Sequence, residues 1–383
     1  MAYTFYETDN RVKRYARTLV ERGDEVEAIV LRRPGQSWSG AEHGVRLVRL
    51  QRRSKTERTP AAHLAKILWF LVQALLLLGV RHIRRRYDII HVHNLPNFLV
   101  FAALVPRLMG ASVLLDIHDA EPELYGYKFG CSSGSTIYRC LLFAERMSCR
   151  FASHVIVANH LWHARLVARS VKAEKCSAIL NYPDLRMFRP SDKPDGAGTR
   201  FLILYPGTLS PHQGVHVAIR AFASVRARMP NARFHVYGEG PARAELIALS
   251  ESLRSGDCIT FFDPLPVEDL AEVMSGADLG VEPKLSEGFS NEALSTKILE
   301  FMAVGVPVLV SRTLVHSQYF GDDLVRFFPP GDEEALAAAL VEAYENGPDK
   351  SSVRRAAAFA EQNSWQRRRG DYLGLVDRLC GAA

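Results

Sequence analysis

Residues 292–310 read EALSTKILEFMAVGVPVLV, and this stretch decides the fold. It contains two glutamates eight positions apart, Glu292 and Glu300, then a small-residue turn at Gly305 and Pro307, then the apolar run 308–310. An eight-residue step is just over two helical turns, so both carboxylates are expected near the same side of one helix. The stretch therefore predicts a helix that carries both glutamates and leads into a buried strand.

The beginning of this helix is a candidate phosphate site. Glu292 is expected at or before the first turn, where the helix dipole favours an anion and free N–H groups point outward. The N–H groups of Leu294, Ser295 and Thr296 would then face a phosphate. Amides for a phosphate and carboxylates for hydroxyls together suit a sugar nucleotide. The alternative is an ordinary amphipathic helix with two solvated glutamates.

The same stretch resembles the Glu-x7-Glu region of retaining glycosyltransferases of family 4. In that family a glutamate and seven residues precede Glu-Ala-Met-Ala, Gly and Pro-Val-Val; here they precede Glu300-Phe301-Met302-Ala303, Gly305 and Pro307-Val308. The resemblance extends over most of the chain. It implies the α/β GT-B fold, in which two Rossmann-like domains face a central cleft and a C-terminal helix crosses back to the N-terminal domain.

Composition is that of a globular protein with a mild excess of positive charge. The chain has 383 residues, 48% of them hydrophobic and 23% charged, with a net charge of +6. This length is sufficient for two domains, and the charge suits a nucleotide, a lipid phosphate or a membrane surface. No stretch resembles a nucleic-acid-binding module, so we expect no nucleic-acid partner.

Cysteine usage and the N-terminus bear on the cellular compartment. The six cysteines are scattered without a CxxC pair, which argues against structural zinc and is typical of reduced thiols. The first residues do not resemble a signal peptide. We expect a cytoplasmic protein, either free or peripheral on the inner face of the membrane.

The first strand of the expected sheet is incomplete in this sequence. A helix is predicted over residues 10–22 and a strand over 26–31. A doubly wound sheet normally begins with a buried strand that lies in its middle. Residues 2–6 are too short and too polar to supply it, so we expect that the chain lacks part of its natural first strand. Two neighbouring strands would then keep unpaired N–H and C=O groups.

Residues 64–80, LAKILWFLVQALLLLGV, form the most apolar stretch. The stretch is near the lower limit for a membrane span and contains Lys66 and Gln73. There are two other interpretations of this stretch. It forms either a buried helix of the domain, or an interfacial helix whose basic flanks are attracted to anionic lipid. Peripheral contact with an anionic membrane therefore stays among the expected partners.

Polar residues follow two predicted strands of the first half. Strand 88–92 is followed by His93 and Asn94, and strand 113–117 by His118 and Asp119. Ligands of open α/β sheets bind beyond the carboxyl ends of the strands. Because LLDIHDAEPELY resembles the acceptor-side loop of the family, His118 is expected to be catalytic and the other three to lie on the acceptor side. A purely structural role for each histidine is the alternative.

The second half alternates strands at 201–205, 233–237 and 259–262 with helices, which predicts a second parallel sheet. Glycines after the first two strands would let the backbone approach a ligand. The family usually has an Arg and a Lys that contact the donor diphosphate, at the positions of Thr208 and Gln213 here; Lys297 is expected to compensate. The predicted donor-binding residues are Gly207, Thr208, Gln213, Gly238, Gly240, Pro266, Leu294, Ser295, Thr296, Lys297 and Glu300.

These observations and the resemblance lead to one expected activity. We expect four segments: an N-terminal acceptor-binding domain (1–188), a linker (189–199), a nucleotide-sugar-binding domain (200–350) and helices that return to the N-terminal domain (351–383). The resemblance implies a retaining transfer of a sugar from a nucleotide diphosphate to a glycan or lipid-linked acceptor, with Glu292 on the sugar hydroxyls. It implies no cofactor and no metal. The alternatives are a catalytically impaired scaffold subunit and a sugar-nucleotide epimerase.

Overall fold

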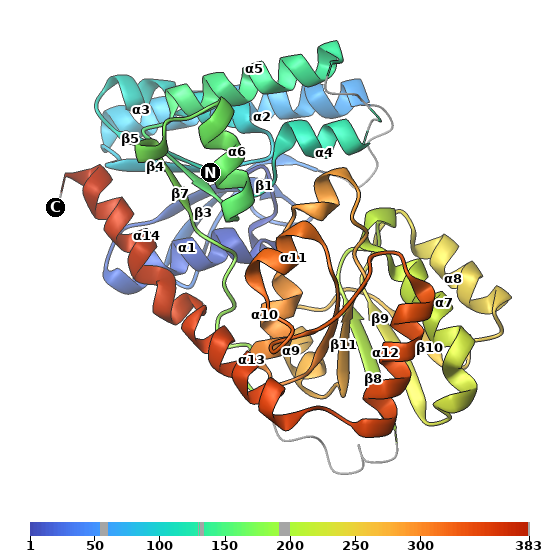
Figure 1. Ribbon diagram of the computed structural model, residues 1–383. Coiled ribbons are helices and arrows are strands. Elements are labelled where there is room, and N and C mark those ends of the chain that lie inside the picture. The colour runs from blue at the N-terminus through green and yellow to red at the C-terminus, as the bar shows by residue number, and fades with distance from the viewer. Residues whose placement is uncertain (54–59, 129, 131–133, 191–199, 382–383) are drawn as a thin grey trace. The chain divides into compact units, whose positions relative to one another are not determined.

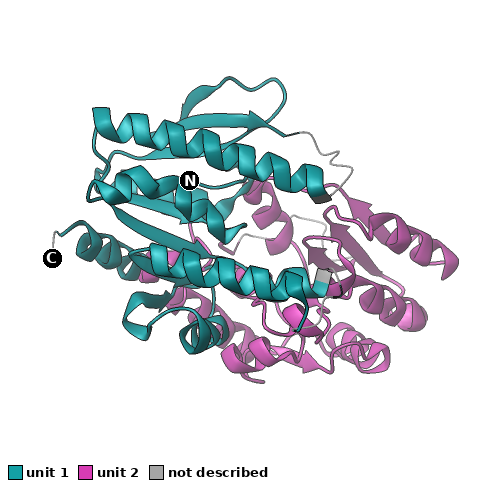
Figure 2. Cartoon of the chain, turned by 90° about the horizontal axis from the view of Figure 1, so that it is seen from above, with its two compact units in different colours: residues 1–181, 369–383 teal, residues 182–368 magenta. Residues whose placement is uncertain are grey.

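A computed structural model describes residues 1–53, 60–128, 130, 134–190 and 200–381. The chain divides into unit 1, Met1–Asn181 with Arg369–Ala383, and unit 2, Tyr182–Arg368 (Figure 2). Most of the expected linker, residues 191–199, lies outside the described residues. Helix α14 (Trp365–Cys380) begins in unit 2 and continues into unit 1, as the resemblance implied for the last helix.

Unit 1 contains two groups of strands with helices around them (Figure 1). One group has the order β1-β3-β2, in which β1 and β3 are parallel, and the other has the all-parallel order β4-β5-β6-β7. The strands are β1 (Glu27–Arg32), β2 (Ser39–Glu42), β3 (Val45–Arg52), β4 (Ile89–His93), β5 (Ser112–Ile117), β6 (His154–Val157) and β7 (Cys176–Ala178).

The helical segments of unit 1 include α1, which confirms the helix predicted over residues 10–22. They are α1 (Asn10–Arg22), α2 (Pro60–Arg84), the 3-10 segment η2 (Asn97–Ala103), α3 (Leu104–Leu108), α4 (Glu121–Lys128), α5 (Thr136–Phe151) and α6 (His160–Arg169). Asp9 caps α1 by accepting the N–H of Val12, and Gly23 ends it in a left-handed conformation. Residues 97–108 form η2 followed by α3 rather than one continuous α-helix.

Helix α2 has one buried face and one exposed apolar face. Phe70, Ala74 and Leu78 are buried in unit 1, whereas Trp69, Leu76 and other large apolar residues are exposed. Within α2, residues 61–84 are long and apolar enough to cross a bilayer, with a mean hydropathy of 1.9 over the most apolar window. The buried face fits a helix of a globular domain equally well, so length and composition alone do not establish a span.

Unit 2 is a six-stranded parallel sheet in the order β10-β9-β8-β11-β12-β13. The strands are β8 (Phe201–Pro206), β9 (Ala232–Tyr237), β10 (Ile259–Phe262), β11 (Leu279–Glu282), β12 (Val308–Ser311) and β13 (Arg326–Phe328). The helices are α7 (Val215–Val225), α8 (Arg243–Ser252), α9 (Val267–Ser275), α10 (Thr296–Ala303), α11 (Leu314–Tyr319), α12 (Glu333–Asn346) and α13 (Lys350–Gln362).

Two apolar layers sandwich this sheet. Residues of α7 and α12 pack with one face in one core cluster, and residues of α9, α10 and α13 pack with the other face in a second cluster. Parallel sheets need such cover on both faces. The predicted second parallel sheet is confirmed.

Two predicted ligand-facing glycines have a packing role at the end of β9. A Cβ on Gly238 would lie 1.9 Å from the carbonyl oxygen of Gly207, and one on Gly240 would lie 2.3 Å from that of Leu209. The turn after β9 therefore packs backbone against backbone on the turn after β8. This contact accounts for both glycines without a ligand.

We predict that Gly238→Ala destabilises unit 2 by about 1–3 kcal/mol, because the added methyl group forces the two turns apart. The control is Gly256→Ala, since a Cβ there would meet no atom within 4 Å. Urea unfolding of both variants tests this, and equal stabilities would contradict the packing role.

Candidate active site

A buried lysine lies where β8 and β11 end in unit 2. Lys297 Nζ is 2.9 Å from Glu282 Oε2 and 3.3 Å from the hydroxyl of Tyr205, and it lies over the Tyr205 ring. The Lys297 side chain is only 13% exposed. Burial opposes its charge, but Glu282 and Tyr205 outweigh burial and raise the pKa of the ammonium. Lys297 therefore stays charged.

Glu282 ends β11 and faces two lysines. Burial alone would raise the pKa of its carboxyl, but Lys297, Lys284 and His316 lower it below the usual value. Lys284 is buried and donates to the carbonyl of Ala293 at 2.7 Å. Two ammonium groups against one carboxylate leave a local excess of one positive charge.

Two histidines near these lysines are neutral at physiological pH. Burial and the charge of Lys284 lower the pKa of both His212 and His316 to about 4. Lys297 lowers both pKa values further. The positive charge of this group therefore belongs to the lysines, which suits an anion such as a phosphate.

Gly207 lies directly over this charge. A Cβ on Gly207 would be 2.9 Å from Lys297 Nζ and 3.3 Å from the Tyr205 hydroxyl oxygen. Thr208 is exposed, and its carbonyl accepts the Tyr205 hydroxyl at 3.0 Å. Gln213 is half-buried, with Nε2 3.3 Å from His212 Nε2. Lys297 thus reaches the turn that lacks the expected basic residues, although its role on a diphosphate stays a prediction.

The predicted helix with two glutamates is wrong at its beginning. Glu292 ends the 3-10 turn η7 (Gly288–Asn291), and α10 begins only at Thr296, so just Glu300 is helical. The physical reason is a competing local structure, because Glu287 and Ser290 form a capping box that fixes η7. The glutamates therefore do not share a helix face.

Because α10 begins later than predicted, the backbone N–H groups that are free at its N-terminus belong to later residues than predicted. Ser295 is the N-cap of α10, so the outward N–H groups belong to residues 296–298 rather than to Leu294. Thr296 and Lys297 keep their predicted places in the first turn, and Glu292 and Glu300 are both half-buried. Pro266 is exposed at the N-cap of α9, after the edge strand β10.

In unit 1 a buried carboxylate organises the ends of β4 and β5. Asp116 is fully buried and accepts two hydrogen bonds of 2.8 Å from Arg11, from Nε and from Nη2. Arg11 Nη2 also donates to the carbonyl of Ile179 at 2.9 Å. Burial would raise the pKa of Asp116, but Arg11 and the nearby histidines hold it well below the usual value.

This carboxylate brings His93 and His118 together. His93 Nδ1 lies 3.1 Å and His118 Nε2 lies 3.2 Å from Asp116 Oδ2, and these two nitrogens are 3.0 Å apart. Burial lowers the pKa of His93 to about 4, so its ring is neutral. The His118 side chain is 22% exposed and is the more accessible of the two rings.

Asn94 and Asp119 hold the loop that carries His118. Asn94 Oδ1 accepts the His118 N–H, and Asn94 Nδ2 donates to the Asp119 carbonyl, both at 2.8 Å. The structure thus assembles all four predicted acceptor-side residues. Through these two hydrogen bonds, Asn94 positions the loop that carries His118 and Asp119.

Three residues of this region were missed by sequence reasoning. Arg11 lies 105 residues before Asp116, so no local pattern links them. Asp116 interrupts the apolar run of β5, and this charge inside a buried strand was an available signal. Glu121 is buried, accepts the N–H of Asn97 at 2.9 Å, and has its pKa raised to about 7 by burial.

His91, His93 and Asp116 also have the spacing of metal ligands, because their donor atoms lie within 4.8 Å of one another. Arg11 already donates to both carboxylate oxygens of Asp116. A cation would therefore lie against a guanidinium group. The arrangement is better described as a hydrogen-bonded cluster around one carboxylate.

Charged groups thus lie at the carboxyl ends of parallel strands in two successive Rossmann-like units, the arrangement of a GT-B protein. The family "Glycosyl transferase 4-like domain" matches residues 8–181, and "Glycosyl transferases group 1" matches residues 189–360. The chain therefore belongs to these glycosyltransferase families.

The chain is also similar in sequence to individual proteins. It is 25% identical over 261 residues to the phosphatidylinositol N-acetylglucosaminyltransferase gpi3 subunit of Schizosaccharomyces pombe, covering 67% of this chain and 53% of that protein. The chain thus spans about half the length of this relative.

The solved structures share the fold. Sucrose-phosphate synthase from Thermosynechococcus elongatus has a TM-score of 0.77 at 20% identity, covering 97% of this chain and 93% of that one. Anabaena Alr3699/HepE in complex with UDP and glucose has a TM-score of 0.74 at 16% identity, covering 98% of both chains.

We predict that Lys297→Met destabilises unit 2 by about 3–5 kcal/mol, because it leaves the buried Glu282 carboxylate without its closest partner. The double variant Lys297→Met/Glu282→Gln should recover most of this loss. Urea unfolding gives the coupling energy. The control is Arg326→Met in the exposed pair with Glu342, where about 0–1 kcal/mol is expected. A double variant as unstable as Lys297→Met would show that the pair does not carry the effect.

Proposed function

We propose that this chain transfers a sugar from a nucleotide-diphosphate donor to a hydroxyl group, with retention of the anomeric configuration. The observation that carries the proposal is the charged, buried Lys297 at the strand ends of unit 2. The nucleotide diphosphate gains negative charge as it leaves, and a fixed ammonium group stabilises that charge best where water is excluded. The first turn of α10 adds N–H groups beside the same lysine.

The proposed roles follow from where the residues lie. Glu300, in the middle of α10, would accept hydrogen bonds from the ribose hydroxyls, and Glu292, before α10, from the sugar hydroxyls. His118 would contact the acceptor hydroxyl, since Asp116 fixes its ring and leaves part of it accessible. Asp116 would act as a positioning residue.

The proposed acceptor is a glycan or a lipid-linked glycan, in the synthesis of a surface polysaccharide or glycoconjugate. The Schizosaccharomyces pombe relative, named for transfer of N-acetylglucosamine to phosphatidylinositol, supports a lipid-linked acceptor. A cytoplasmic enzyme at the inner face of the membrane would meet such an acceptor.

A catalytically impaired scaffold subunit is the competing function, because Thr208 and Gln213 occupy the positions of the expected basic residues. The charged Lys297 favours activity instead. A panel of UDP-, GDP- and ADP-sugars separates the two. Hydrolysis of any one donor without acceptor would argue against the scaffold, and absence of both binding and hydrolysis across the panel would overturn the transferase.

We predict that Glu300→Ala weakens binding of the donor found in this panel by about 1.5–3 kcal/mol, the range for a lost hydrogen bond to a charged group. Titration calorimetry measures the change. Glu251→Ala is the control, because Glu251 is exposed on α8. If both variants bind the donor with the same affinity, Glu300 does not contact the donor.

We also propose that the exposed face of α2 rests on an anionic membrane. Large apolar side chains on this face recur at helical spacing, and Leu76 and Ile83 are 61% and 67% exposed. Its exposed residues are Leu64, Leu68, Trp69, Val72, Leu76, Val80 and Ile83. Such a stripe, with basic flanks, is typical of a helix that lies in the membrane interface.

Helix α3 extends this surface, because it contacts α2 and its Leu108 side chain is 78% exposed. Basic residues adjoin the apolar ones, with exposed Arg84, Arg85 and Arg86 at the end of α2. Apolar insertion together with positive charge favours an anionic lipid surface over a neutral one.

We predict that the protein floats with vesicles containing phosphatidylglycerol at low salt and is released as salt rises, because ions screen exposed charges over about 10 Å at 0.1 M. Leu76→Ser/Ile83→Ser should reduce flotation several-fold. Leu314→Ser in unit 2, where the side chain is 52% exposed, is the control and should float like the unaltered chain. Flotation that is absent, or equal with pure phosphatidylcholine, would contradict the proposal.

A further inference from the structure

Two short segments lie side by side beyond the ends of the parallel strands β4 and β5 in unit 1. Residues 94–97 follow β4, and residues 118–121 follow β5. Asn94 joins the two segments at one end, because its side chain accepts the N–H of His118 and donates to the carbonyl of the next residue, both at 2.8 Å. We call these two segments together the loop clamp.

Glu121 joins the two segments at the other end of the loop clamp. Its Oε2 accepts the N–H of Asn97 at 2.9 Å, and both residues are buried. Inside the clamp, Asn94 Nδ2 donates to Asn97 Oδ1 at 3.1 Å. A hydrogen-bonded path therefore runs from the carboxyl group of Glu121 through Asn97 and Asn94 to the backbone of His118.

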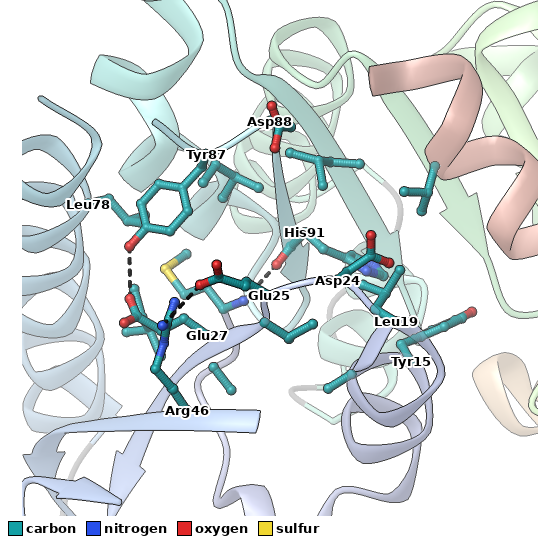
Figure 3. Close-up of a pocket in the computed structure, with 18 of the residues that line it drawn as sticks. Tyr15, Leu19, Asp24, Glu25, Glu27, Arg46, Leu78, Tyr87, Asp88 and His91 are labelled. Carbon is teal, nitrogen blue, oxygen red and sulfur yellow. Dashed lines mark hydrogen bonds and ion pairs between the residues drawn. The ribbon is translucent and has the colours of Figure 1, made fainter. Parts of the chain in front are cut away.

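The ring of His118 has a separate support. Its Nε2 lies against Asp116 and His93, and the His93 ring stacks on the His91 ring with centroids 4.1 Å apart. His91 in turn lines the cavity of about 710 Å³ that Figure 3 shows. We call Asp116, His93 and His91 the histidine–carboxylate cluster. This cluster holds the ring of His118, whereas the loop clamp holds its backbone.

The histidine–carboxylate cluster keeps one charge state near neutral pH. Burial opposes the charge of Asp116, but Arg11 and the nearby histidines hold its pKa well below the usual value. Burial lowers the pKa of His93 to about 4 and that of His91 well below its usual value. The ring support of His118 therefore does not respond to small changes of pH in this range.

The loop clamp differs, because Glu121 lacks a cation that would keep it ionised. Within the described part of the chain Glu121 forms no ion pair, and its hydrogen bond is the one from Asn97. Burial is the main cause that raises its pKa to about 7, the charge of Glu145 on α5 acts in the same direction, and the Asn97 N–H acts in the opposite one. Glu121 therefore gains or loses its proton near neutral pH.

The charged groups around Glu121 are engaged with other partners. Glu145 accepts a hydrogen bond of 2.8 Å from Arg169 of α6. Tyr125, one turn further along α4, has its pKa raised by burial and by the charge of Glu121, while Arg53 lowers it. Arg53 thus acts on the tyrosine, and the carboxyl group of Glu121 keeps its raised pKa.

We propose that Glu121 is a positioning residue for His118, and that the proton on its carboxyl group sets how firmly the loop clamp holds. Without the proton, the carboxylate accepts the Asn97 N–H in a charge-assisted hydrogen bond, which is about twice as strong as a neutral one. With the proton, this bond weakens, and so does the path to the His118 backbone. The effect on the reaction rests on the proposed contact of His118 with the acceptor hydroxyl.

The test measures how well the His118 amide is protected from hydrogen exchange at about pH 6 and about pH 8, one unit on either side of the Glu121 pKa. Protection is expressed relative to an unstructured peptide, which removes the intrinsic effect of pH. It should rise several-fold at the higher pH in the unaltered chain. In Glu121→Gln it should stay constant, because the amide side chain has no proton to lose.

The matched control is Glu123→Gln on the same helix. Arg169 outweighs burial and lowers the pKa of Glu123, so this variant should respond to pH like the unaltered chain. Equal protection at both pH values in the unaltered chain would overturn the proposal, whether or not Glu121→Gln folds. A rise that persists in Glu121→Gln would also overturn it, because another group would then carry the response.

These exchange measurements need no substrate, so they separate the loop clamp from the proposed function. In the transfer reaction, kcat should change less between the two pH values in Glu121→Gln than in the unaltered chain, while KM for the donor stays the same. Identical kcat profiles would overturn the positioning role of Glu121. An unaltered chain that transfers no sugar would contradict the proposed function alone, and the exchange result would still decide the clamp.

Discussion

A buried carboxylate remains ionised only when cations and donors replace the water that it loses, and Asp116 depends on this constraint. Arg11 reaches it from α1, His93 from β4 and His118 from the loop after β5. Asp116 therefore ties α1, β4 and the loop after β5 together at the carboxyl ends of the strands. Without Arg11, the carboxylate would lose its closest compensating charge, and the two histidines would lose a fixed partner.

Unit 2 meets the same constraint at a second buried carboxylate, with more compensating charge. Glu282 ends a central strand as Asp116 nearly does, but two lysines face it and leave positive charge in excess. Both buried pairs lie at the carboxyl ends of parallel strands, where helix N-termini and loops converge. In each unit, an ion pair with an oppositely charged side chain holds the buried charged group in place. The net charge left over differs between the units, as expected if one holds a diphosphate and the other a hydroxyl.

The sequence predicted the alternation of strands and helices well, because apolar runs and caps are local signals. Gly23 and Asp9 are examples, since they end and begin α1 where the pattern placed them. The beginning of α10 was not predictable from spacing, since the capping box of Glu287 and Ser290 creates a different local turn. The pairing of Arg11 with Asp116 depends on the tertiary fold, because the two residues are 105 positions apart in the sequence. Lys297 was predicted from its charge, but its burial against Glu282 emerged only from the packing of α10 on β11.

Helix α14 imposes an order on how the two units fold during synthesis. Tyr372 of α14 packs on Tyr15 with ring centroids 4.3 Å apart, and its hydroxyl lies 3.1 Å from His91 Nδ1. Unit 1 therefore needs residues from both ends of the chain, whereas unit 2 is one continuous segment. On the ribosome, unit 2 can close as soon as its own residues emerge, but unit 1 also needs residues of α14 that are translated after unit 2. The N-terminal unit is thus the last to be finished, the reverse of the usual order of translation-coupled folding.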